Sequence, residues 1–444
     1  MKTTHLLVAL SIAPLASACA TEEPGDGQQS ESELRVSYYD DVLPVLTTRC
    51  QSCHADGGVA PFAVDNYEDA KAWGAAMAES ARARTMPPFA VDASGECNTF
   101  ADAQWLDEEE IAVIEAWVEG GMEKGDENAE RVELPTPNAL RDTGNVVTLS
   151  GPANYSPVGE DYPGGELEDY QCFLAEYDAD EDRFLTGFDV APGNVATVHH
   201  VLALEVDPEF AGNGAQIEKL DAESPDQVGW DCFGAAGDGV IPEGVPVAWA
   251  PGTGAVNYPE GTGIRIEAGH LLVIQMHYNL ANGDGTDTTE IEVAMADSVE
   301  REGKQALIDP FLFSAVLGNP ESIPAGQERA EYTWEMPLEQ SLFVDEDDDA
   351  KVDVYGMLPH MHQRGQTFDV EFEVDGAMEC GAKVAKWDFN WQRIYFYDQP
   401  KEMTWADKVK VTCGYNTMAD SEPVLPGFGT ADEMCLLGLY VVPQ

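Results

Sequence analysis

The spacing of apolar residues predicts helices in the first part of the chain. From residue 36 to residue 125, apolar positions recur every three to four residues, as in the run from Ile111 to Val118. Asp107 followed by Glu110 is typical of a capping box, and Gly120 is expected to end this helix. An earlier helix is indicated by the same spacing at Trp73, Met77 and Ala81. We therefore predict a small all-α domain over residues 36–125.

After residue 141 the period changes from 3.6 to two, which favours strands. Phe184 to Val190 and Phe368 to Val374 alternate in this way, and clusters of Gly, Pro and Asp separate the runs. The roughly 300 residues that remain exceed what one compact sandwich needs. We predict two all-β antiparallel sandwich domains, jelly-roll-like, over residues 142–300 and 301–444. The acidic, proline-containing residues 126–141 are expected to be a linker.

The N-terminus has the features of an export signal. Residues 1–18 combine a short basic start, an apolar run and small residues before Cys19, and the run is too short for a transmembrane helix. Cleavage before Cys19 with lipidation of its thiol is one outcome, and plain cleavage after Ala18 is the other. Residues 19–35 are expected to form a flexible acidic tether. We expect an exported protein, either a periplasmic or cell-surface lipoprotein or a secreted protein.

The charge of the chain excludes some partners. The sequence has 82 Asp and Glu residues against 23 Lys and Arg residues, a formal net charge of -59. Such a surface repels phosphate backbones and anionic headgroups, so we expect no nucleic-acid partner and no membrane contact beyond a lipid anchor at Cys19. Neutral or cationic partners are favoured, and a solvated acidic surface explains the charge.

The run from Cys50 to His54 is a c-type haem attachment pattern, Cys-x-x-Cys-His. Cys50 and Cys53 would add to the haem vinyl groups, and His54 would ligate the iron. Met86, held by the two prolines that follow it, is the candidate sixth ligand. The alternatives are a short-loop disulfide beside an incidental histidine, and a buried core methionine. The segment resembles a small class I cytochrome c, which implies one covalently bound haem c and an electron-transfer role.

Five further histidines fall in three tight motifs. His199 and His200 are adjacent in a strand-like run, so they can share one metal only if the backbone is irregular there. His277 ends another apolar run. His360 and His362 have the spacing that puts both rings on one strand face. Imidazole suits copper, zinc or iron, and an added thioether favours reduced copper. Each motif alone could instead be a structural histidine.

From about Tyr170 onwards the chain resembles the copper type II, ascorbate-dependent monooxygenases. The order of motifs carries this resemblance: His199-His200, Gln275-Met276-His277-Tyr278, His360-Met361-His362 and Glu433-Met434-Cys435. It implies a first copper site that stores and passes electrons, and a second site where dioxygen binds and chemistry occurs. The two sites would lie on separate sandwich domains, facing each other across a solvent-filled cleft. The first site would be formed by His199, His200 and His277; the second by His360, His362 and Met434, with Gln275 also counted among the catalytic residues.

The resemblance also implies two disulfides, Cys172 with Cys232 and Cys413 with Cys435. By count alone, the six cysteines outside the haem motif and Cys19 permit 15 full pairings. Cys97 and Cys380 have no counterpart in the family. Their pairing with each other is one option, and it would staple the helical domain to the second sandwich.

The substrate groups of the peptide-amidating members are missing. Leu358, Leu436 and Gly438 stand where those members carry Arg, Asn and Tyr, so we expect a more apolar pocket and a small organic substrate. The leading hypothesis is a dicopper monooxygenase that hydroxylates a C–H bond with dioxygen, with electrons from an external donor passing through the fused haem. The alternative is a non-catalytic exported redox or copper-binding protein. No His-Glu-x-x-His motif supports a zinc hydrolase, and the run from Asp345 to Asp349 lacks a complete calcium loop.

Overall fold

The structure is a computed structural model, and it describes most of the chain from Arg35 onwards. The described residues are 35–56, 60, 62–135, 138–150, 154–162, 165–177, 180–224, 228–233, 235–251, 253–311, 314, 321–342, 344, 350–429 and 431–444. The expected signal peptide, Cys19, nearly all of the tether and the acidic run 345–349 lie outside them. No helix among these residues is both long and apolar enough to cross a membrane.

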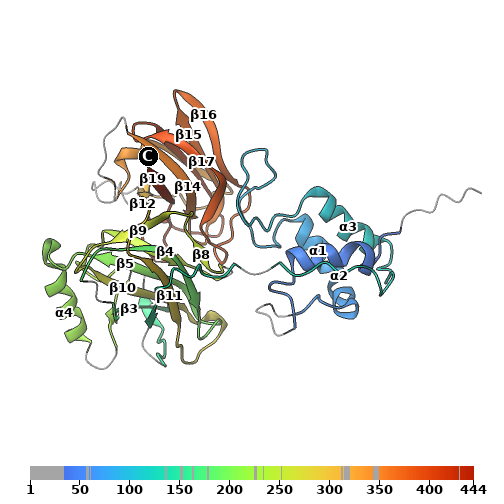
Figure 1. Ribbon diagram of the computed structural model, residues 1–444, viewed down its shortest axis with the longest axis horizontal. Helices are drawn as coiled ribbons and strands as arrows, with labels where there is room; N and C mark the ends of the chain where they lie inside the picture. The colour runs from blue at the N-terminus through green and yellow to red at the C-terminus, as the bar shows by residue number, and fades with distance from the viewer. Residues whose placement is uncertain are drawn as a thin grey trace, which may run out of the picture. The chain divides into compact units, whose positions relative to one another are not determined.

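Within residues 36–125 the structure has helices, whereas residues 83–107 contain neither helix nor strand (Figure 1). A π-helical turn, Tyr38–Val42, leads into α1, Leu43–Arg49; α2 spans Tyr67–Arg82 and α3 spans Glu108–Glu119. Asp107 and Glu110 form the predicted capping box, and α3 ends at Gly120. These helices bury the side chains of Tyr38, Leu46 and Trp117 completely. Residues 126–135 and 138–141 contain neither helix nor strand.

The N-terminal half of the β region holds two sheets. One contains β2, β3, β10, β5 and β7 in that order, with β6 beside β3; the other contains β1, β11, β4 and β9, with β8 beside β4. Phe188 and Ile274, one from each sheet, belong to the core between them. The bounds are β1 Val146–Ser150, β2 Glu160–Tyr162, β3 Gly165–Leu174, β4 Arg183–Ala191, β5 Val198–Val206, α4 Asn213–Glu223, β6 Trp230–Asp231, β7 Gly244–Trp249, β8 Val256–Asn257, β9 Thr262–Ile266, β10 Leu271–Asn279 and β11 Glu290–Ala296.

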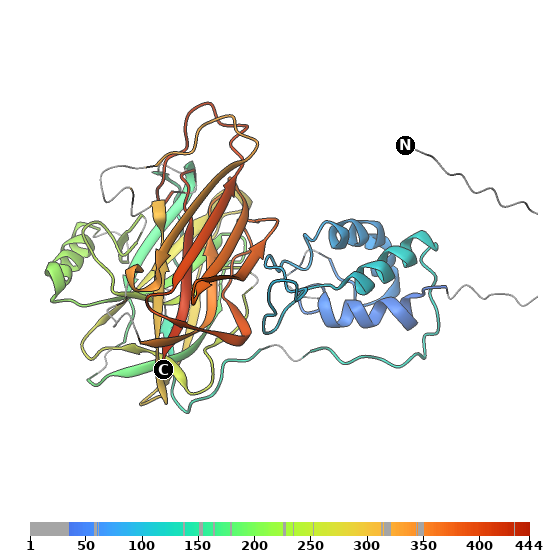
Figure 2. The ribbon, with the colours of Figure 1, turned by 90° about the horizontal axis from the view of Figure 1, so that it is seen from above.

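The C-terminal half repeats this arrangement. One sheet runs β12, β19, β14, β17 and the other runs β13, β18, β15, β16; Figure 2 shows the orange and red strands of this half side by side. Along β15, Phe368, Val370 and Phe372 are buried in the core, as their alternation predicts. The bounds are β12 Arg301–Ile308, β13 Ala330–Pro337, β14 Lys351–His360, β15 Gly365–Val374, β16 Ala377–Val384, β17 Tyr395–Thr404, β18 Lys408–Tyr415 and β19 Leu436–Pro443. Short 3-10 turns cover Phe210–Gly212, Leu280–Asn282 and Leu338–Gln340.

The two halves share one sheet. Three residue pairs join β12 to β9, so a nine-stranded sheet runs from β1 through to β17. Among the strand pairs of the described residues this pair alone is parallel, so the expectation of purely antiparallel sheets is wrong at this point. At the junction Gly303 approaches the ring of Tyr440 so closely that a Cβ there would collide with it. Tyr440 in turn donates a hydrogen bond to Thr262 of β9, 2.8 Å.

Candidate metal centres

The first candidate site lies on two neighbouring strands, β5 and β10. His200 pairs with His277 and Val198 pairs with Tyr278, so His199 is an extra residue in a β-bulge. The bulge is the backbone irregularity that adjacent histidines need in order to turn towards one point. One ring nitrogen from each of His199, His200 and His277 lies within 4.8 Å of the others. Three imidazoles arranged this way can hold one metal ion.

His277 is fixed on two sides by strand β3. Its Nε2–H donates to the carboxylate of Glu168, and its ring stacks on Tyr170 with centroids 4.0 Å apart. Because a carboxylate holds the proton on Nε2, Nδ1 of His277 is left as a lone pair. Burial lowers the pKa of His277 well below its ordinary value, so the ring is neutral.

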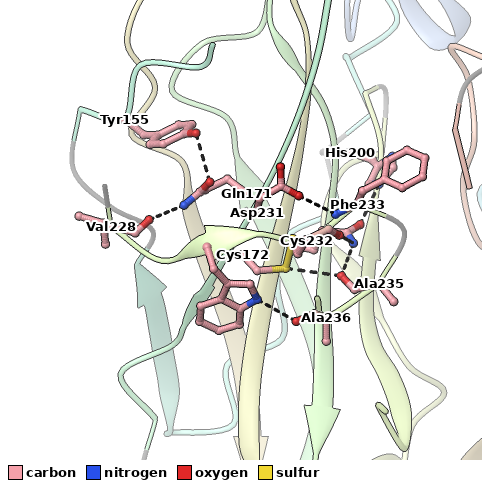
Figure 3. Close-up of a disulfide and its surroundings, with 12 residues drawn as sticks. Tyr155, Gln171, Cys172, His200, Val228, Asp231, Cys232, Phe233, Ala235 and Ala236 are labelled. Atoms are coloured by element: carbon pink, nitrogen blue, oxygen red, sulfur yellow. Dashed lines mark hydrogen bonds between the residues drawn. A yellow bond between two sulfur atoms is a disulfide. The ribbon is translucent and has the colours of Figure 1, made fainter. Parts of the chain in front are cut away.

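His200 is oriented through Gln275 and a disulfide-bound loop. The amide of Gln275 donates to the carbonyls of Cys232 and Ala235, so its Oε1 must accept the Nε2–H of His200, at 3.3 Å. The Cys172–Cys232 disulfide fixes this loop. Figure 3 shows the disulfide, the loop carbonyl of Ala235 and His200. Gln275 therefore positions a ligand of the first site and does not belong to the second site.

The ring nitrogens of the first site are arranged to bind a cation. Nδ1 of His200 and Nδ1 of His277 face each other at 3.2 Å, and both carry lone pairs because both Nε2 atoms carry protons. Two lone pairs at that distance repel unless a cation lies between them. Both ring nitrogens of His199 are buried and have no hydrogen-bond partner. Burial also lowers the pKa of His199 to about 4. The residues present thus fit a copper ion held by three neutral imidazoles.

The second candidate site begins where β14 ends. His360 is the last residue of β14, and its ring lies 5.1 Å from that of His362, while Met361 between them is buried on the core side. Gln392 uses its amide to donate to the Phe389 carbonyl, so its Oε1 accepts the Nδ1–H of His360 at 2.5 Å. The carbonyl of Asp432 accepts from Nδ1 of His362 at 3.1 Å. Both rings therefore keep Nε2 for a metal.

Met434 lines the same cavity as these rings and is positioned by its neighbours in the chain. Glu433 is fully buried, and its carboxylate accepts the backbone N–H groups of His362 and Arg364 at 3.0 and 2.7 Å. Burial raises the pKa of Glu433 to about 7. The Tyr415 hydroxyl donates to the Met434 carbonyl, and the Cys413–Cys435 disulfide closes the segment. Two imidazoles and a thioether form a donor set that favours reduced copper.

A single cavity of about 500 Å³ is lined by both sets of candidate ligands. The two sites therefore open onto one shared cavity, and that cavity is partly open to solvent. Phe389 lies between them: its ring stacks on His199 at 4.6 Å and lies 6.0 Å from His362. Leu358, Leu436 and Gly438 all line the cavity, and its walls are mostly apolar.

The residues of the haem motif lie in the helical region. Cys50 and Cys53 are free thiols and do not form a short-loop disulfide. Nδ1 of His54 donates to the Phe62 carbonyl at 3.0 Å, which leaves Nε2 for an iron. Phe62 also stacks on Trp73, which is 43% exposed. These features fit a covalently attached haem. Met86 follows α2, is 38% exposed, and lines a small pocket with Phe89 and Trp105.

Comparison with known proteins finds similarity mainly in the C-terminal part of the chain. Residues 313–442 match the family model for the C-terminal domain of copper type II ascorbate-dependent monooxygenases. Over these residues the chain is similar to this copper-dependent monooxygenase family. It is 26% identical over 259 residues to a putative DBH-like monooxygenase protein 2 of Homo sapiens, covering 56% of this chain and 48% of that protein.

Other relatives are similar over comparable stretches. A tyramine beta-hydroxylase of Caenorhabditis briggsae is 21% identical over 270 residues, covering 57% of this chain and 41% of the relative. The chain thus spans about half the length, or less, of these relatives. A solved structure of PNGF-II aligns with 7% identity over 68% of this chain and 65% of its own, with a TM-score of 0.30, which carries no functional argument.

Several residues at the sites carry no motif in the sequence. Glu168, Phe389 and Gln392 each contact a candidate ligand. Of these, only Glu168 could have been placed from the sequence pattern. It alternates with Tyr170 and Cys172 along β3, which puts all three on one face of the sheet. His270, which matched no ligand position, lies beside the carboxylates of Glu205, Glu243 and Glu267 at 2.9 to 3.7 Å. It is a structural histidine of the N-terminal half.

Proposed function

We propose that the chain is a dicopper monooxygenase that hydroxylates a C–H bond of a small, largely apolar organic molecule. The observation that carries this proposal is the cavity onto which both candidate ligand sets open. A storage protein does not need two chemically different donor sets facing one shared, mostly apolar cavity. Copper bound at the two sites would supply single-electron chemistry and the reduction of dioxygen. The partners are then the substrate, dioxygen and an external electron donor, either a small reductant or a redox protein.

The chain's own residues would prepare both sites before a metal binds. Glu168 and Gln275 hold protons on Nε2 of His277 and His200, which leaves Nδ1 atoms at the first site. Gln392 holds a proton on Nδ1 of His360, which leaves Nε2 at the second site. Such outer partners keep each ring in one tautomer and one orientation, so little reorganisation is needed when the metal binds or changes its oxidation state.

The apolar walls of the cavity would select the substrate. Leu358 and Leu436 offer no group that could bind a carboxylate, which makes a peptide C-terminus a poor substrate candidate. A tyramine beta-hydroxylase is among the relatives, and a compact molecule with an apolar body is compatible with the space of about 500 Å³.

The helical region would supply electrons. We propose that residues 36–125 form a cytochrome c-like domain in which Cys50 and Cys53 hold one haem c and His54 and Met86 ligate it. The free thiols and the hydrogen bond that leaves Nε2 of His54 open support this assignment. Bound haem would supply a one-electron carrier of fairly high potential. Residues 126–141 would be the linker, followed by copper domains over residues 142–300 and 301–444.

We also propose that the protein is exported. Residues 1–18 would be the signal, Cys19 the site of lipidation, and residues 19–35 a tether. Mass spectrometry of the mature N-terminus separates a lipidated Cys19 from plain cleavage after Ala18.

The test of the proposed activity is oxygen uptake by the copper-loaded, haem-containing protein with a chemical reductant, across small amines, phenols and apolar molecules. We expect substrate-dependent uptake that disappears in Met434→Ile while the haem spectrum is unchanged. Met403→Ile is the matched control, because Met403 is equally buried but lies away from the cavity. Unchanged uptake in Met434→Ile, or zinc in place of copper, would overturn the assignment. Copper reduction without product formation would favour the non-catalytic carrier.

A further inference from the structure

The helical region is fastened to the C-terminal half by the chain that follows Met86. Residues 87–101, here called the strap, run along the edge of β16 and β17. Cys97 forms a disulfide with Cys380, and Asn98 donates from its side chain to the carbonyls of Cys380 and Gly381 at 2.6 and 2.7 Å. Backbone N–H groups of Asp92 and Ala101 donate to Lys383 and Phe396, both at 2.8 Å. The strap is therefore a permanent part of the C-terminal sandwich.

The strap also contributes to the core of that sandwich. Phe89, Val91 and Phe100 are buried in the same apolar cluster as the strands of the C-terminal half. The ring of Phe89 meets that of Tyr395 edge to face with centroids 5.0 Å apart, and the Ala90 N–H donates to the Tyr395 hydroxyl at 3.3 Å. Phe89 is only three residues beyond Met86, so the proposed haem ligand is joined directly to a rigid contact.

The other side of this contact leads to the second candidate site. The guanidinium of Arg393 lies over the rings of Phe89 and Tyr395 at 5.5 and 5.9 Å. Gln392, the adjacent residue, accepts the Nδ1–H of His360 at 2.5 Å. Covalent bonds and one short hydrogen bond thus connect the strap contact to a ligand of the second site. To reach His199 of the first site, an electron must also cross the van der Waals gap between the stacked rings of Phe389 and His199.

We propose that electrons from the haem enter the copper pair at the second site, through the strap and the Gln392–Tyr395 segment. In this step one electron leaves ferrous haem, which becomes ferric, and reduces copper(II) to copper(I) at the site of His360, His362 and Met434. No bond is made or broken, and the external donor reduces the haem again. Electrons tunnel more readily through covalent and hydrogen bonds than across van der Waals gaps, which favours this route over direct delivery to the first site. The inference rests on the proposed function, because it requires both the haem and the coppers.

The test follows the haem spectrum and not turnover. The copper(II)-loaded protein is reduced at its haem by an anaerobic light pulse, and the reoxidation of the haem is timed. We expect a fast phase whose rate does not depend on protein concentration. The double substitution His360→Ala and His362→Ala should slow this phase by an order of magnitude or more, whereas His199→Ala with His277→Ala should leave it within a factor of two. A fast phase that survives loss of the second site, or that disappears with loss of the first, overturns the route.

A second pair of variants tests the strap contact itself. Phe89→Leu keeps an apolar side chain in the core and removes the ring that meets Arg393 and Tyr395. We expect it to slow haem reoxidation several-fold, while Val91→Ala, at a buried residue of the strap that carries no ring, does not. Equal rates in the two variants would contradict a route through Phe89. Oxygen uptake with a chemical reductant that reaches the coppers directly should persist in Phe89→Leu. Absence of that uptake in the unaltered protein would instead contradict the proposed function.

Discussion

The ring of Phe389 stacks on the imidazole of His199 at a centroid distance of 4.6 Å, although the two residues belong to opposite halves of the β region. The same ring lies 6.0 Å from His362. One side chain therefore contacts a candidate ligand from each copper site. Because His199 has no hydrogen-bond partner at either ring nitrogen, its ring is oriented by packing, on Phe389 and on His277 at 4.8 Å.

Replacing Phe389 should weaken the first site. A stacked aromatic pair contributes about 0.5–1.5 kcal/mol beyond its buried area, so Phe389→Leu should reduce copper(I) affinity roughly two- to tenfold at the first site. Competition with a copper(I) chelator measures this change. The affinity of the second site should change less, since its rings are held by Gln392 and the Asp432 carbonyl. An unaltered first-site affinity would contradict a positioning role for the ring.

Glu168 should matter more than Phe389, because it fixes the tautomer of His277. Loss of such a hydrogen-bond partner typically costs 10- to 100-fold in metal affinity, and we expect a loss of about that size in Glu168→Ala. Glu168→Gln keeps an acceptor for the Nε2–H and should lose less. The chelator competition applies here too. If the two variants lost affinity equally, the carboxylate and not the hydrogen bond would be the important feature.

Metal binding should release few protons near pH 6. Burial lowers the pKa of His199 to about 4 and that of His362 to about 3. An ordinary histidine, with a pKa of about 6.5, is mostly protonated at that pH and must lose its proton to bind a metal. These rings are already neutral. Calorimetric titration of the copper-free, haem-containing protein with silver(I), in two buffers of different ionisation enthalpy, counts the protons. Release of more than about one proton per metal would contradict the buried, neutral state.

The stability of the shared sheet should depend on Gly303, at the junction of β12 and β9. Gly303 of β12 leaves no room for a Cβ against Tyr440, so Gly303→Ala should lower the free energy of unfolding by about 1–3 kcal/mol. Gly254→Ala is the matched control, because a Cβ there meets no atom within 4 Å. Denaturant unfolding compares the two variants. Equal stability would mean that Tyr440 can move aside without loss.

The parts of the fold that depend on neighbouring residues were predictable from the sequence. The capping box at Asp107 and Glu110 places the start of α3, and alternation at Phe368 to Phe372 places β15. The adjacent pair His199 and His200 required an irregular strand, and the bulge is found there. In each case the signal is local, because helix caps and strand faces are set by residues a few positions apart.

The parallel pairing of β9 with β12 had no such signal. It joins strands of separate halves over only three residue pairs, and nothing in either strand's own pattern indicates its partner. Phe389 and Gln392 were missed for a similar reason: they lie between strands, and only the folded chain brings them to His199 and His360. The motif containing Gln275 was recognised from the sequence. That Gln275 orients His200 follows only from the structure, in which its amide donates to the carbonyls of Cys232 and Ala235.

The most direct test of the proposed activity is the origin of the oxygen atom in the product. The copper-loaded, haem-containing protein is supplied with a chemical reductant, isotopically labelled dioxygen and a panel molecule that supported oxygen uptake. The product is then analysed by mass spectrometry. A monooxygenase places one labelled oxygen atom in each product molecule, and Met434→Ile yields none. Product that carries oxygen from water, or labelled product in equal yield from Met434→Ile, would contradict the assignment of chemistry to the second copper site.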